Sequence, residues 1–226
     1  MQAGSRGFAG RRGLAFFVLW VGLIVLLPSC SLFESKLRVP VSEVKLPPVC
    51  PPALPEPELP YRKVDLEYPI TSVSNPKLYV MKSNRRLLVV NDDVLVRDYI
   101  CGLGPAPNGD KQVSGDGKTP EGEFFICVKN PGSRFYKSLG LSYPDVKHAD
   151  QALLEGTIGP AEYRRIVEAV ERRSAPPWNT PLGGAIMIHG GGGHEDWTKG
   201  CIAVSNRAMD ELFQVIDVGA PVQVLP

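Results

Sequence analysis

Two short apolar runs separated by a glycine-rich loop dominate the last third of this chain. The first, residues 186–189, ends in His189 and is followed by a glycine, and the second, residues 200–204, opens with a glycine and Cys201. Apolar runs of this length, rich in β-branched residues and bounded by glycines, are typical of strands. The pattern therefore predicts a mainly β domain in which the ends of two strands bring an imidazole and a thiol together.

This imidazole and this thiol form a candidate catalytic pair. A cysteine is a strong nucleophile only as the thiolate, so a catalytic thiol needs a neighbouring group that accepts its proton. Cys201 is the predicted nucleophile, and His189 is the predicted general base because it ends a strand and is held rigidly. His194 is the alternative base, but it lies among glycines and can move. An ordinary core histidine is the other interpretation of His189, and the neighbouring Gly190 and Gly200 favour catalysis.

The residues around the pair resemble the L,D-transpeptidase catalytic domain family, cysteine enzymes that remodel peptidoglycan. The family motif is His-Gly, a variable loop, Ser or Thr, one residue, Gly-Cys, an aliphatic residue and often Arg, and residues 189–203 follow it. Lys199 replaces a frequent second histidine and Ala203 replaces the frequent arginine, which leaves substrate choice open. The branch with Asp-Trp-Thr and Gly-Cys-Ile-Ala is the most similar, and residues 115–122, Gly-Asp-Gly-Lys-Thr-Pro-Glu-Gly, match a second family segment.

The resemblance implies a mainly β (α+β) fold, the L,D-transpeptidase β-sandwich with a small helical insertion and a C-terminal helix. It also implies that the backbone carbonyl of Gly190 orients His189, since no Asp or Asn stands at the family spacing. Gly200 has no side chain, so backbone N–H groups near Gly200 and Cys201 can approach a developing oxyanion. Removal of one such donor typically costs about 10²- to 10³-fold in rate.

Three residues outside the pair are predicted to contact the substrate. Thr198 and Lys199 precede the glycine of the motif and can offer polar contacts, with an ordinary loop role as the alternative. Tyr143 belongs to a polar and aromatic segment, residues 130–144, that is similar to the same family branch. We expect this segment to line the approach to the thiol.

The reaction that the resemblance implies is acyl transfer in two steps. The Cys201 thiolate attacks the carbonyl of the diamino acid at position three of a peptidoglycan stem peptide, and the terminal D-alanine leaves as a thioester forms. An amine from a second stem or from a protein then resolves the thioester and makes a cross-link. With water as acceptor the enzyme is an L,D-carboxypeptidase or an amidase, and a non-catalytic peptidoglycan-binding lipoprotein is the third alternative.

No metal or other cofactor is predicted. His189, His194, Glu195 and Asp196 are common ligand types and represent the alternative of a metal hydrolase. Two histidines five residues apart in a glycine-rich loop lack the i, i+4 spacing of the helical zinc motif. The thiol chemistry is therefore favoured over metal chemistry.

The remaining segments of the domain alternate between strand and helix patterns. A helix is predicted to begin at Pro160, which suits a first helical position, and a shorter helix over residues 149–154 precedes it. Ser205 is the predicted cap of a last helix. Strands are predicted where β-branched and aromatic residues stand between turn residues, and they are 78–81, 86–90, 94–100, 124–128, 202–204 and 221–225. The Pro160 helix has an apolar face made of Tyr163, Ile166, Val167 and Val170.

The N-terminus has the composition of a secretory signal. Three arginines within the first 12 residues precede an apolar run, residues 14–27, that is shorter than the roughly 20 residues of a membrane-spanning helix. The next residues, Leu-Pro-Ser-Cys, resemble a bacterial lipoprotein box in which Cys30 carries the lipid, and the unusual Pro28 leaves an uncleaved anchor as the alternative. We expect a lipid-anchored protein at the periplasmic face of the cell envelope, with Ser31 favouring the outer membrane.

Three segments follow from these patterns: a signal peptide over residues 1–29, a lipidated N-terminus and proline-rich tether over residues 30–66, and a catalytic domain over residues 67–226. Eight prolines between residues 39 and 60 predict an extended tether, because proline fixes φ and lacks the backbone donor. At about 3.1 Å per residue, some 20 residues of polyproline geometry reach roughly 60 Å from the membrane anchor.

Charge and cysteine content restrict partners further. Lys and Arg number 25 and Asp and Glu 24, and no basic stripe is present, so nucleic acid is not an expected partner. Stem peptides and, through the lipid, a membrane are the expected partners.

Among the five cysteines, Cys101 and Cys127 both lie in strand-like runs. They are either joined by a disulfide, as an oxidising compartment permits, or are unpaired core thiols.

Overall fold

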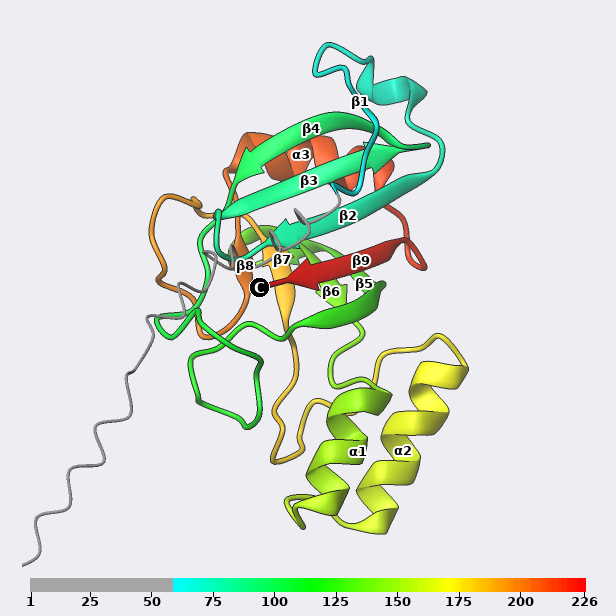
Figure 1. Ribbon diagram of the computed structural model, residues 1–226, viewed down its shortest axis with the longest axis vertical. Coiled ribbons are helices and arrows are strands. Elements are labelled where there is room, and N and C mark those ends of the chain that lie inside the picture. Colours follow the sequence, from blue (N-terminus) through cyan, green and yellow to red (C-terminus); the bar gives the residue numbers. More distant parts are fainter. Residues whose placement is uncertain (1–58) are drawn as a thin grey trace, which may run out of the picture. The chain divides into compact units, whose positions relative to one another are not determined.

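A computed structural model of the protein describes residues 59–226, which contain nine strands and three α-helices (Figure 1). The predicted signal peptide, Cys30 and most of the predicted tether lie outside the described residues. The strands are β1 (Lys63–Val64), β2 (Pro76–Met81), β3 (Arg86–Asn91), β4 (Val94–Ile100), β5 (Gly122–Ser133), β6 (Tyr136–Leu141), β7 (Met187–His189), β8 (Ile202–Ala203) and β9 (Pro221–Leu225). The helices are the short 3₁₀ turn η1 (Ile70–Ser72), α1 (Val146–Leu154), α2 (Pro160–Glu171) and α3 (Asn206–Val215).

All nine strands belong to one sheet with the order β1-β4-β3-β2-β9-β5-β6-β7-β8. β2, β3 and β4 form the antiparallel meander that their turn residues predict. The last strand, β9, inserts between β2, to which it is parallel, and β5, to which it is antiparallel. The C-terminal strand therefore joins the N-terminal meander to the strands that carry the site.

The sheet bends at β5, which is much longer than the predicted strand 124–128. Its first part pairs with β9 up to Phe125, and its second part pairs with β6 from Ile126 onward. The register shifts between Ile126 and Val128, and a bulge of this kind bends a strand and increases its twist. An isolated bridge between Gly102 and Ala203 links the end of β4 back to β8. The predicted mainly β fold is confirmed, and its layers come from one bent sheet.

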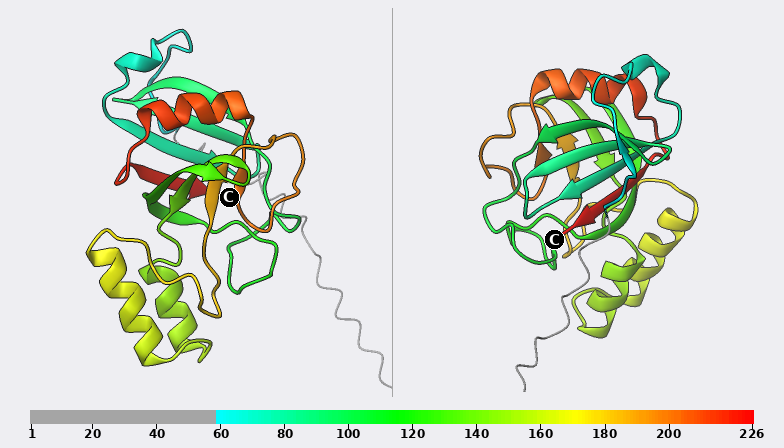
Figure 2. Two further views of the ribbon diagram at one scale, coloured as in Figure 1. Left: turned by 180° about the vertical axis from the view of Figure 1, so that it is seen from behind. Right: turned by 45° about the horizontal axis from the view of Figure 1, so that its top comes forward.

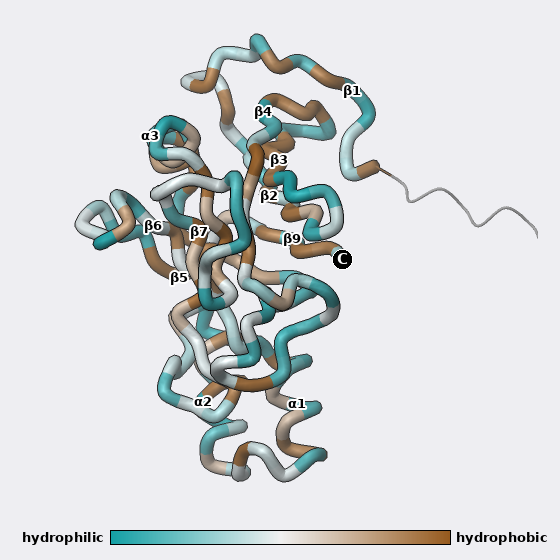
Figure 3. Tube along the Cα trace, turned by 90° about the vertical axis from the view of Figure 1, so that its left-hand side faces the viewer, coloured by the Kyte–Doolittle hydropathy of each residue, from teal (hydrophilic) through white to brown (hydrophobic). Residues whose placement is uncertain are grey.

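Alternate residues of the strands fill the core between the layers. In β3, Leu87 and Val89 face this core, while Leu88 and Val90 form a second small cluster on the outer face under Tyr61. Figure 3 shows apolar stretches, in brown, along the strands around the core. β1 pairs in parallel with β4, so residues 59–66 are part of the folded domain and the predicted boundary at residue 67 lies too late.

Two of the three α-helices, α2 and α3, begin where the sequence predicted. α2 begins at Pro160 as predicted, and α1 begins at Val146, three residues before the predicted start, because Asp145 caps it by accepting the His148 N–H at 2.9 Å. α1 and α2 pack against each other over a core of their own. α3 follows the Ser205 cap and packs against β6 (Figure 2). Within residues 59–226 no helix is long and apolar enough to cross a bilayer.

Cys101 and Cys127 are both free thiols. Cys101 follows β4 and is fully buried, whereas Cys127 lies at the bend of β5 and is half-buried. Burial raises the pKa of Cys101 to about 12 and that of Cys127 to about 11. The disulfide considered from the sequence is not formed, and burial favours the protonated thiol at both residues.

Candidate active site

The two halves of the predicted pair come from neighbouring parallel strands. His189 ends β7 and Cys201 directly precedes β8, with Ile188 opposite Ile202 and His189 opposite Ala203. Side chains alternate between the faces of a strand, and Ile188 and Ile202 belong to the hydrophobic core. Cys201 and His189 therefore lie on the same face of the sheet, opposite to the core isoleucines.

His189 is held in one orientation and as a neutral ring. Only 2% of its surface is exposed, and its Nδ1 lies 2.7 Å from the carbonyl oxygen of Gly190, so the hydrogen bond that the resemblance implied is present. A carbonyl can only accept, so Nδ1 carries the proton and Nε2 is left as an acceptor. Burial lowers the pKa of His189, and the positive charge of Arg134 lowers it further against the opposing effect of the Gly190 bond.

The Cys201 thiol is half-buried and rests on the backbone of β7. Its Sγ accepts the Met187 N–H at 3.4 Å and faces the carbonyl oxygen of Ala185 at 3.7 Å. Burial raises the pKa of the thiol, while the Met187 hydrogen bond and the positive charges of Lys111 and Arg134 lower it. Catalytic hydrogen bonds are often loose without substrate and tighten in the complex. Burial outweighs the charges, so the pKa of Cys201 is raised overall and the thiol would need a base to become a thiolate.

Two aromatic rings enclose the imidazole. Phe135, in the turn between β5 and β6, stacks on His189 with 4.7 Å between ring centres and 23° between planes. Trp197 meets both rings edge-on, at 5.5 Å from His189 and 5.4 Å from Phe135, and its Nε1 donates to the Gly192 carbonyl at 3.1 Å. The segment 130–144 thus reaches the site as predicted, through a residue that sequence reasoning did not single out.

Asn206 is a second residue that sequence reasoning missed. Its Oδ1 accepts the N–H of Gly191 at 2.9 Å, and a Cβ on Gly190 would stand 2.5 Å from the same oxygen. A side chain on Gly190 would therefore displace the Asn206 amide from the Gly191 N–H and would also crowd the Phe135 carbonyl oxygen at 3.0 Å. The first residue of α3 in this way fixes the loop that orients His189.

Gly200 has a packing role that the sequence did not reveal. Its φ is +116°, and a Cβ there would lie 2.5 Å from the carbonyl oxygen of Lys118 in the Gly-Asp-Gly-Lys segment. Its N–H donates to Thr198 Oγ1 at 3.1 Å and is not free for an oxyanion. Gly200 thus lets the backbone turn before Cys201 meet the backbone at Lys118 directly.

Two of the residues predicted to contact the substrate, Thr198 and Tyr143, are buried. Thr198 is 5% exposed, and its hydroxyl accepts from Gly200 and donates to the Cys201 carbonyl at 2.8 Å, so it shapes the turn. Tyr143 is fully buried and its hydroxyl donates to the Leu182 carbonyl at 3.2 Å. Neither side chain reaches the surface, because each hydroxyl is used within the fold. Lys199 is exposed beside the motif.

The side chains considered as metal ligands from the sequence do not gather into a metal site. Asp196 binds Arg85 at 2.7 Å and accepts the Leu103 N–H at 2.8 Å. His194 is exposed and lines a shallow hollow with Arg86 and Tyr99. No three His, Cys, Asp or Glu side chains within residues 59–226 are grouped so that they could hold a metal ion.

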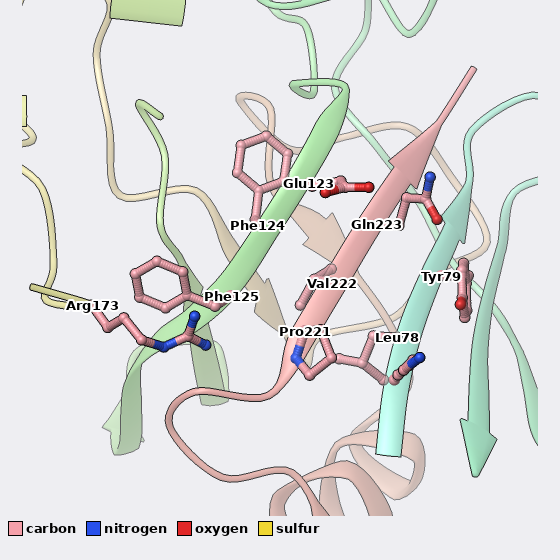
Figure 4. A pocket seen from close by; sticks show the side chains of 10 residues that line it. Leu78, Tyr79, Glu123, Phe124, Phe125, Arg173, Pro221, Val222 and Gln223 are labelled. Carbon is pink, nitrogen blue, oxygen red and sulfur yellow. The ribbon is translucent and has the colours of Figure 1, made fainter. Parts of the chain in front are cut away.

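A hollow of about 390 Å³ lies elsewhere, on the outer face of β5, β9 and β2 (Figure 4). Arg173 stacks there over Phe125 at 4.7 Å from the ring centre, and Glu123, Gln223 and Tyr79 complete the wall. Neither Cys201 nor His189 lines it, so it is separate from the candidate active site.

Known proteins are similar to this chain over most of the described residues. The family model YkuD, the L,D-transpeptidase catalytic domain, matches residues 75–224. YafK of Escherichia coli (strain K12), whose name proposes an L,D-transpeptidase activity, is 29% identical over 142 residues, which are 62% of this chain and 42% of YafK. The chain thus spans less than half the length of this curated relative.

Solved structures of similar proteins are more distant. The helical cell shape determining protein Pgp2 from Campylobacter jejuni is 23% identical, with 67% of this chain and 48% of that chain covered and a TM-score of 0.42. Bd1075 from Bdellovibrio bacteriovorus is 20% identical, with 68% and 49% covered and a TM-score of 0.44. The family match, in contrast, covers well over half of this chain and includes both His189 and Cys201. The chain therefore belongs to the L,D-transpeptidase catalytic domain family.

Proposed function

We propose that this protein is a peptidoglycan-remodelling L,D-transpeptidase that acts through a thioester on Cys201. One observation carries the proposal: a buried, neutral His189, oriented by Gly190, lies on the same sheet face as the thiol. The arrangement supplies a nucleophile and a base whose free Nε2 can take the thiol proton.

The first half-reaction forms the thioester. His189 Nε2 accepts the proton of Cys201, and the thiolate attacks the carbonyl carbon of the diamino acid at position three of the stem peptide. A carbon–sulfur bond forms, the carbon–nitrogen bond to the terminal D-alanine breaks, and the imidazolium returns its proton to the leaving amine. The enclosure of His189 by Phe135 and Trp197 keeps the ring aligned during both transfers.

The oxyanion of this step needs a hydrogen-bond donor near the nucleophile. The Gly200 N–H is occupied by Thr198. The Cys201 N–H, by contrast, donates no hydrogen bond within residues 59–226. We assign the oxyanion contact to the Cys201 N–H, with Thr198 and Gly200 setting its direction, and we retain the exposed Lys199 as a polar contact to the substrate.

The second half-reaction decides between transfer and hydrolysis. An acceptor amine loses a proton to His189 and attacks the thioester, the carbon–sulfur bond breaks, and the thiolate is restored. Water in the same place would make the enzyme an L,D-carboxypeptidase or an amidase. We expect the domain to act on stem peptides at the periplasmic face of the cell envelope, anchored by lipid on Cys30, with no cofactor and no nucleic-acid partner.

Exposure of the protein to a tetrapeptide stem or a carbapenem, followed by intact-protein mass spectrometry, tests this proposal. We expect a covalent adduct on Cys201 in the wild type and none in Cys201→Ala, with turnover reduced about 10⁴-fold or more and unchanged by a strong chelator. Cys127→Ala removes another half-buried thiol and is the control that should keep the adduct. Full turnover by Cys201→Ala would rule out the thioester, and product analysis separates transfer from hydrolysis.

A further inference from the structure

One charged residue at the rim of the site has no role in the mechanism above. Arg134 lies in the turn between β5 and β6, with its guanidinium carbon 4.7 Å from the centre of the Phe135 ring. That ring stacks on His189. The turn itself is packed against the active-site loop, because the Phe135 carbonyl oxygen would stand 3.0 Å from a Cβ on Gly190. Arg134 is therefore held at the rim of the site, on the ring that stacks on the imidazole.

The charge of Arg134 is not neutralised by the protein. Other arginines of the domain, such as Arg85, Arg86 and Arg97, have carboxylate partners. Arg134 is exposed and forms no ion pair within residues 59–226. Its positive charge helps to lower the pKa of His189 and opposes the rise in the pKa of Cys201 that burial causes.

A guanidinium with these properties is suited to bind a carboxylate. Its planar fork matches both oxygens of a carboxylate, and hydrogen bonds between charged groups are about twice as strong as neutral ones. Stacking on Phe135 restricts the side chain, so less rotamer freedom is lost on binding. The Phe135 ring joins it to the imidazole, so a carboxylate bound there would belong to a peptide that occupies the candidate active site.

We infer that Arg134 binds a free carboxylate of the donor peptide and selects donors that carry one. This inference rests on the proposed function, because it assigns a subsite to the acyl donor of Cys201. The substrate class that it defines is a stem peptide with an unmodified carboxylate near the reacting carbonyl. A donor with that carboxylate amidated should bind less tightly to the wild-type enzyme.

Steady-state kinetics with two matched donors test the inference, one tetrapeptide with free carboxylates and its amidated twin. For Arg134→Gln we expect KM for the free-carboxylate donor to rise about tenfold or more, equivalent to about 1.4 kcal/mol, and KM for the amidated donor to change less than about twofold. Arg134→Lys keeps the charge without the fork and should fall between. Arg165→Gln, which removes an exposed arginine from α2, is the charge-matched control and should behave as the wild type.

An equal effect of Arg134→Gln on both donors would overturn the inference, since the residue would then act only through the local field. If the wild type turns over neither donor, the proposed function fails. Isothermal titration calorimetry then tests separately whether Arg134 binds the carboxylate. In that experiment Cys201→Ala and the Cys201→Ala, Arg134→Gln double variant are titrated with the free-carboxylate peptide. Tighter binding by the single variant supports the subsite, and equal affinities overturn it.

Discussion

Gly200 illustrates how much a single position in this site depends on backbone packing. Its positive φ and its direct contact with the Lys118 carbonyl mean that no side chain fits between the catalytic turn and the Gly-Asp-Gly-Lys turn. A glycine before a catalytic cysteine suggests an oxyanion role from the sequence. The hydrogen bond to Thr198 reveals that its N–H is already used.

We expect Gly200→Ala to lower both the stability of the domain and the reactivity of Cys201, by more than the cost of an unfavourable backbone φ angle alone. A residue forced into a rarely populated backbone region costs of order 1–3 kcal/mol, and the clash with Lys118 would in addition displace Cys201. Gly156→Ala, at a φ of +72° with nothing near its Cβ, is the matched control and should show only the strain. Urea denaturation and the rate of Cys201 acylation measure the two effects. Equal losses of stability and unchanged acylation in the two variants would contradict the packing argument.

At the scale of elements, α1 is tied to the loop under the active site by a buried histidine. His148 is 4% exposed, its Nδ1 bonds to Asp145, and its Nε2 lies 3.0 Å from Asp110 Oδ1. Burial alone lowers the pKa of His148, but the hydrogen bonds to Asp110 and Asp145 outweigh it and raise the pKa. Lys147 adds a contact at 2.5 Å to Asp110. The imidazolium thus links the helical insertion to the loop that continues to Lys118.

This link predicts a pH-dependent stability difference. Because the folded pKa of His148 is raised, its stabilisation is complete below about pH 6.5, the ordinary pKa, and is lost as the pH rises through the folded value. His148→Gln should therefore lose about 1–3 kcal/mol of unfolding free energy near pH 6, with the difference from wild type shrinking toward alkaline pH. His194→Gln, at an exposed histidine, is the control. Thermal unfolding between pH 5 and 9 provides the measurement, and a pH-independent difference would disprove the ionic link.

At the scale of the whole domain, the chain before η1 is an integral part of the sheet. Tyr61 packs over Leu88, Val90 and Leu95 on the outer face of the meander, and Arg62 donates to the Asp93 carbonyl at 2.8 Å. A proline-rich composition concealed this from sequence reasoning, since two residues of β1 carry no strand pattern. The domain therefore begins several residues earlier than its composition indicates.

Replacement of Tyr61 in the full-length protein tests this boundary. Tyr61→Ala should lower the unfolding free energy by about 1–3 kcal/mol, because it uncovers the apolar side chains of β3 and β4. Leu59→Ala, at a side chain that is 58% exposed, should change it by less than about 0.5 kcal/mol. Chemical denaturation measures both variants. Identical denaturation midpoints for Tyr61→Ala and the wild type would indicate that residues 59–66 belong to the tether and not to the folded domain.

The sequence by itself determined the local elements and the chemistry of the pair. Strand runs, the Pro160 start, the Ser205 cap and the motif residues His189 and Cys201 depend on neighbours in the chain, and short-range patterns carry that information. The family resemblance added the Gly190 carbonyl as the partner of His189. These predictions needed no knowledge of which strands lie side by side.

Only the tertiary structure decided which distant segments share the site. The pairing of β6 with β7 brings the turn with Arg134 and Phe135 to His189, and loop packing brings the Lys118 carbonyl against Gly200. Burial then removed Tyr143 from the predicted substrate contacts. The physical reason is that register, bulges and cross-strand packing join residues far apart in the chain, and a one-residue shift in any of them would expose different side chains.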